Sequence, residues 1–408
     1  MSNPLGVYIS VPFCKAKCTF CNFASGAFST DRLQGYVDRL ESEIRGRREA
    51  REQLGVSLNQ KVDTVYFGGG TPSLLSSSQV AQIFRTLRNE FEMDGDAEIT
   101  LECAPGQLAV ETLEQLLRQG MNRISLGVQS FVDQETRAVG RLHTREICET
   151  EIRRLRVAGV EDINIDLIAG LPHQTEETWR YSLEQAIASN VPHVSVYMLE
   201  VDEDSRLGQE VLARGARYHA SAVPDEDSIA AWYEIACETL DAAGIRQYEI
   251  SNFARDGHPS RHNLKYWRRK PYIGFGLDAH SMLPTGTGAV RFANSDDLDA
   301  YLAADAIVSP FALLPRQGIT RDREPEFLGP SEAFEETLFL GLRLNEGVRL
   351  DGLRETFGEP IVQDVMPAIH EVCAAGLLTL ERDTLRLTGR GRMASNEVFS
   401  RLLVPVAV

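Results

Sequence analysis

The sequence predicts an α/β protein built on a parallel sheet, followed by a small α+β domain. Up to about Leu199, short apolar or β-branched runs alternate with longer amphipathic segments, as in repeated βα units. From Ser331 to Val408 the pattern changes to helical segments followed by a hairpin. A chain of 408 residues is long enough for two or three domains with a sizeable core.

Composition excludes several classes of protein. Hydrophobic residues make up 43% and charged residues 25%, values that argue against disorder or a fibrous repeat. The net charge of −17 argues against general binding to nucleic acid or anionic lipid. No run approaches 18 apolar residues, so no membrane span is expected. Residues 1–13 lack the features of a secretory signal, which favours a cytoplasmic location.

The first half contains six candidate strands, each short and bounded by Gly, Pro or polar residues. They span Val7–Val11, Val62–Phe67, Glu98–Glu102, Arg123–Val128, Ile163–Ile168 and Val194–Leu199. Ser76 and Gln79 can form a capping box before one intervening helix, and Thr175 can cap another. Six βα units are compatible with an open partial barrel or a doubly wound sheet. In either, functional residues gather at the C-terminal strand ends.

The second half is divided by composition. An amphipathic helix is expected over Asp225–Ala243, and Gln247–Pro284 is rich in aromatic and basic residues. Pro284–Pro330 is rich in Gly and Pro, and we expect a connection with little regular structure there. The predicted parts are a core at 1–245, a second region with this connection at 246–330, and a C-terminal domain at 331–408.

The C-terminal segment predicts a helix-plus-hairpin domain similar to a winged helix. Helices are expected over Ala333–Leu342 and Ile361–Ala375, and hairpin strands over Leu377–Leu380 and Thr384–Leu387. Such units often bind DNA, but several glutamates on this one disfavour that function. A lid or support for the core is the preferred interpretation.

Three cysteines are clustered in a loop directly after the first strand. Cys14, Cys18 and Cys21 have C-x3-C-x2-C spacing, and their thiolates can hold one face of a compact metal centre. Structural zinc normally needs four ligands, and no His or fourth Cys stands nearby. A [4Fe–4S] cluster with one open iron fits better, with zinc and free thiols as alternatives. The other cysteines are interpreted as small buried apolar side chains: Cys103, Cys148, Cys237 and Cys373.

The cysteine spacing after a first strand resembles the signature of the radical S-adenosylmethionine superfamily. The run Gly68-Gly69-Gly70-Thr71-Pro72 after the second strand resembles its glycine motif, in which bare backbone binds the methionine amino group. The resemblance implies a partial (β/α)6 barrel. It also implies a [4Fe–4S] cluster held by the three cysteines, with S-adenosylmethionine bound beside it.

The resemblance narrows to the group that contains oxygen-independent coproporphyrinogen dehydrogenases and HemW-type haem chaperones, and it covers essentially the whole chain. The matching segments are Tyr8–Cys14, Leu101–Pro105, Ser125–Phe131, Arg141–His143 and Asp166–Pro172. By this resemblance, S-adenosylmethionine would be surrounded by Tyr8, Phe20, Gly69, Gly70, Thr71, Glu102, Gln129, Arg141 and Asp166. The carboxylates there can accept bonds from ribose hydroxyls or an ammonium group, and Arg141 can pair with the methionine carboxylate.

Two departures from the dehydrogenases favour the HemW type. Those enzymes carry a further Cys two residues after the motif, where this chain has Phe23 after Asn22. The segment before the first strand is also only about six residues long, too short for their N-terminal extension. Ser10 stands where many of these proteins have His, so no role is assigned to that side chain.

A downstream segment matches the HNxxYW pattern associated with HemW proteins. In it, His262 is a competent axial ligand for haem iron, and Tyr266 and Trp267 can pack on the macrocycle. Positive charge for the propionates would come from Arg261, Lys265, Arg268 and Arg269. The alternative is a solvated basic turn with packed aromatic side chains.

These features together predict a chaperone that binds haem, a [4Fe–4S] cluster and S-adenosylmethionine and delivers haem to acceptors such as respiratory haemoproteins. The alternative is a radical enzyme: a coproporphyrinogen III dehydrogenase acting by oxidative decarboxylation, or a related methyltransferase. The sequence leaves open whether S-adenosylmethionine is cleaved, which protein accepts haem, and whether the chain forms a homodimer.

Overall fold

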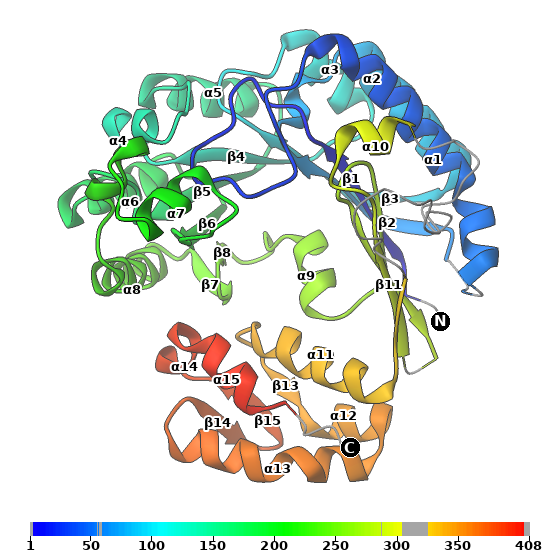
Figure 1. Cartoon of the computed structure of the whole chain (residues 1–408), viewed down its shortest axis with the longest axis vertical. Coiled ribbons are helices and arrows are strands. Elements are labelled where there is room, and N and C mark those ends of the chain that lie inside the picture. Colours follow the sequence, from blue (N-terminus) through cyan, green and yellow to red (C-terminus); the bar gives the residue numbers. More distant parts are fainter. Residues whose placement is uncertain (1–2, 55, 57–58, 287, 304–324, 404–408) are drawn as a thin grey trace.

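A twelve-stranded sheet forms the centre of the protein (Figure 1). The computed structural model describes residues 3–54, 56, 59–286, 288–303 and 325–403. The six predicted strands are confirmed as β1 (Leu5–Val11), β2 (Lys61–Gly69), β3 (Glu92–Cys103), β4 (Arg123–Gln129), β5 (Asp162–Ala169) and β6 (His193–Met198). They are parallel neighbours in chain order. A doubly wound sheet reverses its strand order, so this order identifies the open partial barrel.

Helices cover the outer face of the parallel strands (Figure 1). They are α1 (Leu33–Leu54), α2 (Ser77–Glu90), α3 (Val110–Arg118), α4 (Asp133–Ala138), α5 (Arg145–Val157) and α6 (Glu176–Ala188). The capping box of α2 is confirmed: the backbone N–H of Gln79 donates to Ser76 Oγ (3.3 Å), and that of Ser76 donates to Gln79 Oε1 (2.9 Å). Thr175 caps α6 through the N–H of Thr178. Both helices therefore begin where side chains satisfy their first N–H groups.

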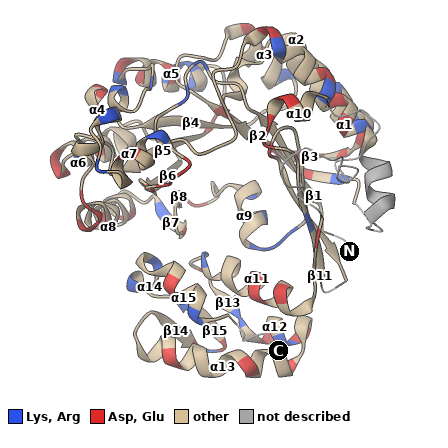
Figure 2. Ribbon diagram, in the orientation of Figure 1, with Lys and Arg blue, Asp and Glu red and all other residues tan. Residues whose placement is uncertain are grey.

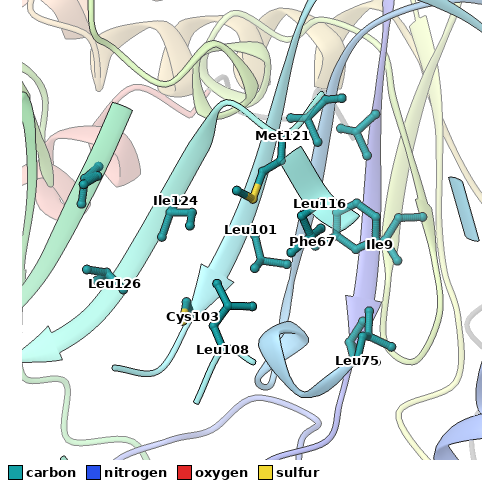
Figure 3. Close-up of a cluster of buried hydrophobic side chains, with 14 of the residues drawn as sticks. Ile9, Phe67, Leu75, Leu101, Cys103, Leu108, Leu116, Met121, Ile124 and Leu126 are labelled. Atoms are coloured by element: carbon teal, nitrogen blue, oxygen red, sulfur yellow. The ribbon is translucent and has the colours of Figure 1, made fainter. Parts of the chain in front are cut away.

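The two faces of the parallel sheet have opposite character. One row of paired residues, Ile9, Phe67, Leu101 and Ile124, is buried beneath the helices, where Leu116 of α3 packs on it (Figure 3). Burying each such side chain contributes about 1.5–3 kcal/mol. The next row points to the concave face and is polar; it runs Glu102, Ser125, Asn164, His193. The barrel interior is thus lined with polar groups.

The strands after residue 245 extend the same sheet at both edges. They are β7 (Arg246–Glu249), β8 (Asn252–Ala254), β9 (Tyr272–Phe275), β10 (His280–Thr285), β11 (Gly288–Ala293) and β12 (Glu326–Leu328). β8 pairs antiparallel with β6 and β7 with β8, while β9 lies parallel to β1 and leads to the antiparallel β10, β11 and β12.

The expectation of little regular structure over Pro284–Pro330 is wrong for much of its described part. That part contains β11, β12 and α10 (Leu298–Ala303). Gly286 and Gly288 lie where β10 turns back into β11, so the glycine content marks a hairpin. Residues 304–324 lie outside the described residues.

Further helical segments complete the barrel region. These are η1 (Thr30–Arg32), η2 (Pro72–Leu74), α7 (Arg206–Leu212), η3 (Arg217–Ala222), α8 (Glu226–Ala242) and α9 (Arg261–Trp267). Asp225 caps α8 by accepting the N–H of Ser228 at 2.7 Å, which confirms the predicted helix. Among the described residues, no helix is long and apolar enough to cross a membrane.

The C-terminal segment forms a small unit with its own core. Its elements are α11 (Pro330–Leu342), β13 (Val348–Arg349), α12 (Leu350–Phe357), α13 (Glu359–Ala374), β14 (Leu378–Glu381), β15 (Thr384–Leu387), α14 (Gly389–Met393) and α15 (Ser395–Arg401). The predicted helices and hairpin are confirmed, and β13 adds a third strand beside β15. Phe334, Leu338 and Ile369 are fully buried in this core.

Ion pairs and backbone bonds tie this unit to α9 and the sheet. Figure 2 shows charged residues of both signs spread over the outer helices. At the junction, Arg269 Nε is 3.0 Å from Glu336 Oε2, and Arg291 Nη2 is 2.8 Å from Glu336 Oε1. The backbone N–H of Asn345 donates to the carbonyl oxygen of Tyr248 in β7 (3.0 Å). The unit is therefore attached at two places.

Replacing Glu336 by Gln should weaken the junction. The change removes the negative charge facing two arginines, of which Arg269 is 10% exposed, and should lower the free energy of unfolding by about 1–3 kcal/mol. Urea unfolding followed by circular dichroism measures this. The control is Glu355→Gln on the exposed surface of α12, and equal midpoints for the two variants would contradict the expectation.

Candidate functional site

The cysteine loop follows β1 and closes on itself through backbone hydrogen bonds. The N–H of Cys14 donates to Gly26 O (2.9 Å), and the N–H of Gly26 donates to Pro12 O (2.9 Å). Thr19, inside the loop, donates its N–H to Val139 O (3.1 Å). The loop is thereby held at the C-terminal end of the sheet, where a parallel sheet places its chemistry.

Each cysteine of the loop has a polar side chain beside it. Arg141 Nη1 donates to Cys18 Sγ at 3.4 Å, and Cys21 Sγ is 3.8 Å from Ser25 Oγ. Burial raises the pKa of the Cys14 thiol, whereas hydrogen bonds from Thr71 and Ser25 act in the opposite direction. Donors aimed at sulfur suit thiolate ligands of a metal centre.

The sulfurs do not form a site for one ion. Among the described residues, no group of three His, Cys, Asp or Glu side chains converges as a mononuclear metal site requires. A cubane cluster attaches its thiolates to separate iron atoms, so it does not need that convergence. Of the isolated cysteines, Cys103 and Cys148 are buried as expected, whereas Cys237 and Cys373 are only partly buried.

The glycine turn after β2 is packed against the cysteine loop. The N–H of Gly70 donates to Val11 O (2.9 Å), and that of Thr71 donates to Phe13 O (2.8 Å). A Cβ on Gly70 would lie 2.7 Å from the carbonyl carbon of Pro12. Gly70 was expected to leave room for methionine; here that room is taken by the backbone of the cysteine loop. Gly69 does line an open cavity.

Two carboxylates lie together on the concave face. Glu102 Oε1 accepts the Tyr66 hydroxyl at 2.9 Å, and Asp166 accepts from Ser125 Oγ (3.1 Å) and Asn164 Nδ2 (2.7 Å). Burial, reinforced by repulsion from Asp166, raises the pKa of Glu102 to about 7. Burial also raises the pKa of Asp166. Paired acids of this kind suit a ligand that supplies hydroxyl or ammonium donors.

Gln129 and Arg141 present polar atoms that are not satisfied by the protein. Within the described part of the chain, Gln129 Oε1 and Arg141 Nε are buried without a hydrogen-bond partner. Gln129 also has φ 66°, a left-handed conformation that is costly for a residue with a side chain. Phe20 packs nearby in a small apolar cluster with Val139 and Leu171. Unpaired buried atoms beside the cysteine loop fit a polar ligand such as S-adenosylmethionine.

A cavity of about 330 Å³ opens between the cysteine loop and the segment that leads from β9 into β10. Tyr8, Ser10 and Gly69 line it from β1 and β2, and Phe23 and Ala24 from the cysteine loop. On the remaining side it is lined by Tyr266, Tyr272, Leu277, Asp278 and His280. Aromatic walls with a few polar groups are typical of small-molecule sites.

His262 does not lie in this cavity. Its ring is 1% exposed; Nδ1 is 2.8 Å from Thr64 Oγ1, and Nε2 is 2.8 Å from the Tyr266 hydroxyl. The ring stacks on Tyr66, with centroids 5.1 Å apart. Burial lowers the pKa of His262 to about 3, which keeps the ring neutral. Both nitrogens have partners within the protein, so coordination of haem iron by His262 would require one of these hydrogen bonds to break.

The basic residues around the HNxxYW segment are likewise paired within the protein. Arg261 donates to Asp96 O, Lys265 Nζ is 2.6 Å from Asp63 Oδ1, Arg268 forms a double contact with Glu346, and Arg269 pairs with Glu336. The guanidinium carbon of Arg343 lies 4.3 Å from the Trp267 ring centroid. In this structure these cations fasten α9 and the turn after it to their neighbours, and binding haem propionates would require them to exchange partners.

Several residues of the concave face were missed. They are Tyr66, Ser125, Asn164, Ser195 and Tyr197, which lie on neighbouring strands. Burial raises the pKa of Tyr197, and the charges of Asp166 and Glu102 act in the same direction, so its hydroxyl faces the hollow of the barrel although 41% of the residue is exposed. The alternation of polar and apolar residues along each strand could have identified them. The apolar residues face the helices, so the polar residues between them must face the concave side.

Gly70→Val should disturb the metal centre rather than only a ligand. The new side chain would collide with the backbone at Pro12, displace the cysteine loop and lower the iron retained after anaerobic reconstitution. Iron and sulfide analysis measures this, with the triple Cys14, Cys18 and Cys21 to Ala variant as zero reference. Gly95→Val makes the same change where no atom lies within 4 Å and should retain full iron. Equal iron in both would contradict the packing role.

Comparison with known families identifies two regions. The Radical SAM superfamily model matches residues 8–186, and the HemN C-terminal domain model matches residues 328–394. Among solved structures, coproporphyrinogen III oxidase (HemN) from Escherichia coli superposes with a TM-score of 0.80 at 22% identity, covering 98% of this chain and 90% of that one. This similarity establishes the fold.

Curated relatives match nearly the whole length. The chain is 32% identical over 397 residues to heme chaperone HemW of Bacillus subtilis (strain 168), covering 97% of this chain and 98% of that protein. It is 30% identical to heme chaperone HemW of Escherichia coli (strain K12), with 98% of each covered. It is also 32% identical to the mitochondrial radical S-adenosyl methionine domain-containing protein 1 of Mus musculus, with 98% and 88% covered. The chain therefore belongs to the radical SAM superfamily and, within it, to the HemW family.

Proposed function

We propose that the protein is a cytoplasmic haem chaperone that binds a [4Fe–4S] cluster, S-adenosylmethionine and haem and passes haem to acceptor haemoproteins, respiratory ones among them. The observation that carries this proposal is the near full-length similarity to proteins named heme chaperone HemW. Phe23 supports it, because the dehydrogenases of the wider group resemble one another in having a further cysteine there.

Cys14, Cys18 and Cys21 would supply three thiolates, leaving one iron of the cluster for S-adenosylmethionine. When bound and reduced, the cluster would be able to supply an electron to that ligand. The surrounding residues hold the loop in place: the N–H of Cys14 donates to Gly26 O, and Arg141 Nη1 donates to Cys18 Sγ. A donor to a ligating sulfur stabilises its negative charge and orients the side chain.

The concave face would bind S-adenosylmethionine through groups that now lack partners or repel one another. Glu102 and Asp166 would accept bonds from ribose hydroxyls or the ammonium group, which would offset the burial and the repulsion that together raise the pKa of Glu102. Gln129 Oε1 and Arg141 Nε would gain partners for buried atoms.

We further propose a division of labour along the chain. Residues 1–245 would hold the cluster and S-adenosylmethionine, 246–330 would contribute to the haem site, and 331–408 would support the barrel. The second part is continuous with the first, since its described strands extend the same sheet.

Binding of S-adenosylmethionine should weaken as the pH falls below about 7. Glu102 is protonated below its raised pKa and then loses acceptor capacity, so affinity should decrease by up to about tenfold per pH unit. Calorimetry at pH 6, 7 and 8 measures this on reconstituted protein. Glu102→Gln should flatten the profile, whereas Glu114→Gln on the exposed surface of α3 should not. A steep profile in Glu102→Gln would assign the titration to another group.

Function is tested by supplying both candidate substrates anaerobically to the reconstituted protein. Stable uptake of haem, followed by its transfer to an apo-haemoprotein, is the expected result. Incubation with coproporphyrinogen III, S-adenosylmethionine and a reductant should leave that substrate unchanged. Formation of protoporphyrinogen, detected by chromatography after oxidation, would reject the chaperone in favour of the enzyme alternative.

A further inference from the structure

We infer that His280, at the mouth of the cavity between the cysteine loop and β10, is the axial ligand that this protein offers to haem iron, with Phe23 packed on the macrocycle. This inference rests on the proposed function, and it assigns a ligand and a place for the haem. The observation behind it is that one cavity brings an accessible imidazole, an exposed phenyl ring and three tyrosine rings together.

The buried histidines cannot reach a haem in this structure. His143 is buried, and its Nε2 lies 3.0 Å from Val128 O. His193 is 2% exposed with both nitrogens engaged, by Asn164 and Tyr248. His262 has the same arrangement, described above. Coordination by any of these would break a buried hydrogen bond and open a packed region.

The remaining histidines lie away from the cavity lining. His258 pairs with Asp162, and His173 contacts His219 at 3.1 Å between ring nitrogens. His370 is exposed on α13, in the C-terminal unit. The sequence contains eight histidines, all within the described residues, and His280 is the one that lines the cavity.

His280 combines accessibility with a carboxylate neighbour. Its side chain is 64% exposed, and Nε2 lies 3.7 Å from Asp278 Oδ1. A metal-ligating imidazole uses one nitrogen for the metal and donates the other N–H, commonly to a carboxylate that orients the ring. Asp278 lies near enough to take that second role once the two side chains close the gap to hydrogen-bond length.

The turn that carries His280 is held rigidly from behind. Glu43 Oε2 accepts the N–H of Gly276 at 3.1 Å, and the Tyr36 hydroxyl accepts the N–H of Leu277 at 2.9 Å. The Tyr36 hydroxyl in turn donates to Ser10 O at 2.7 Å, on β1. These bonds connect the turn to α1 and to the strand that leads into the cysteine loop, so the position of His280 is set relative to that loop.

Phe23, in the cysteine loop, forms another part of the cavity wall. Its side chain is 64% exposed although it is large and apolar, and it lines the same cavity as His280. Exposed apolar side chains at a cavity mouth are typical of binding sites for apolar ligands. A single accessible ligand at the mouth also leaves haem available to an acceptor, which suits transfer better than a deeply enclosed site.

The test compares ferric haem binding by the wild type, His280→Ala and His370→Ala, followed by Soret absorption. His280→Ala should lose the imidazole-ligated spectrum and bind haem about tenfold or more weakly, by analogy with other disrupted metal sites. His370→Ala removes another exposed imidazole, outside the cavity, and should behave as wild type. Phe23→Ala should weaken binding while keeping the wild-type spectrum.

Adding free imidazole to His280→Ala distinguishes the loss of an iron ligand from the loss of folding. Added imidazole should restore the wild-type spectrum of His280→Ala, because a small ligand can occupy the vacated position. Wild-type spectrum and affinity in His280→Ala would overturn the inference while leaving the chaperone proposal standing. A wild-type protein that binds no haem would instead overturn the chaperone proposal and this assignment with it.

Discussion

The two-sided sheet is the constraint on which the rest of this protein depends. Successive residues of a strand point to opposite faces, so each parallel strand must serve the helical core and the barrel interior together. Ile9, Phe67, Leu101 and Ile124 meet the first requirement and contribute apolar burial. Their neighbours carry hydroxyl, amide and carboxylate groups that an apolar core would not tolerate. The interior stays polar because the stability of the fold comes from the other side.

Close backbone contact joins the two halves of the candidate cofactor site. The cysteine loop and the glycine turn belong to different βα units, and they meet through the bonds from Gly70 to Val11 and from Thr71 to Phe13. Gly70 has no side chain to separate them. Two sequence motifs some fifty residues apart are therefore parts of one substructure, in which the glycine segment positions the cysteines as well as lining the neighbouring cavity.

Local signals made the strands, the helix caps and the cysteine loop predictable, because strand alternation, Ser76 with Gln79, and C-x3-C-x2-C spacing act over a few residues. The surroundings of His262 were not predictable in this way. Thr64, which contacts its ring, and Asp63, which pairs with Lys265, are about two hundred residues away in the sequence. A cationic, aromatic segment has the same composition whether it awaits an anionic ligand or is already neutralised by distant carboxylates. Only the tertiary pairing distinguishes the two cases.

The attachment of the C-terminal unit at β7 has a consequence for how the protein behaves outside its native state. β7 is the last strand of the large sheet, and Glu249 forms a bridge with Leu344 while Asn345 bonds to Tyr248 and Gln247. An uncovered strand edge is a template for pairing with another chain. During synthesis the barrel emerges before the segment that covers this edge, so the nascent protein passes through an interval in which β7 is exposed to self-association. Assistance from a folding factor is most valuable in that interval.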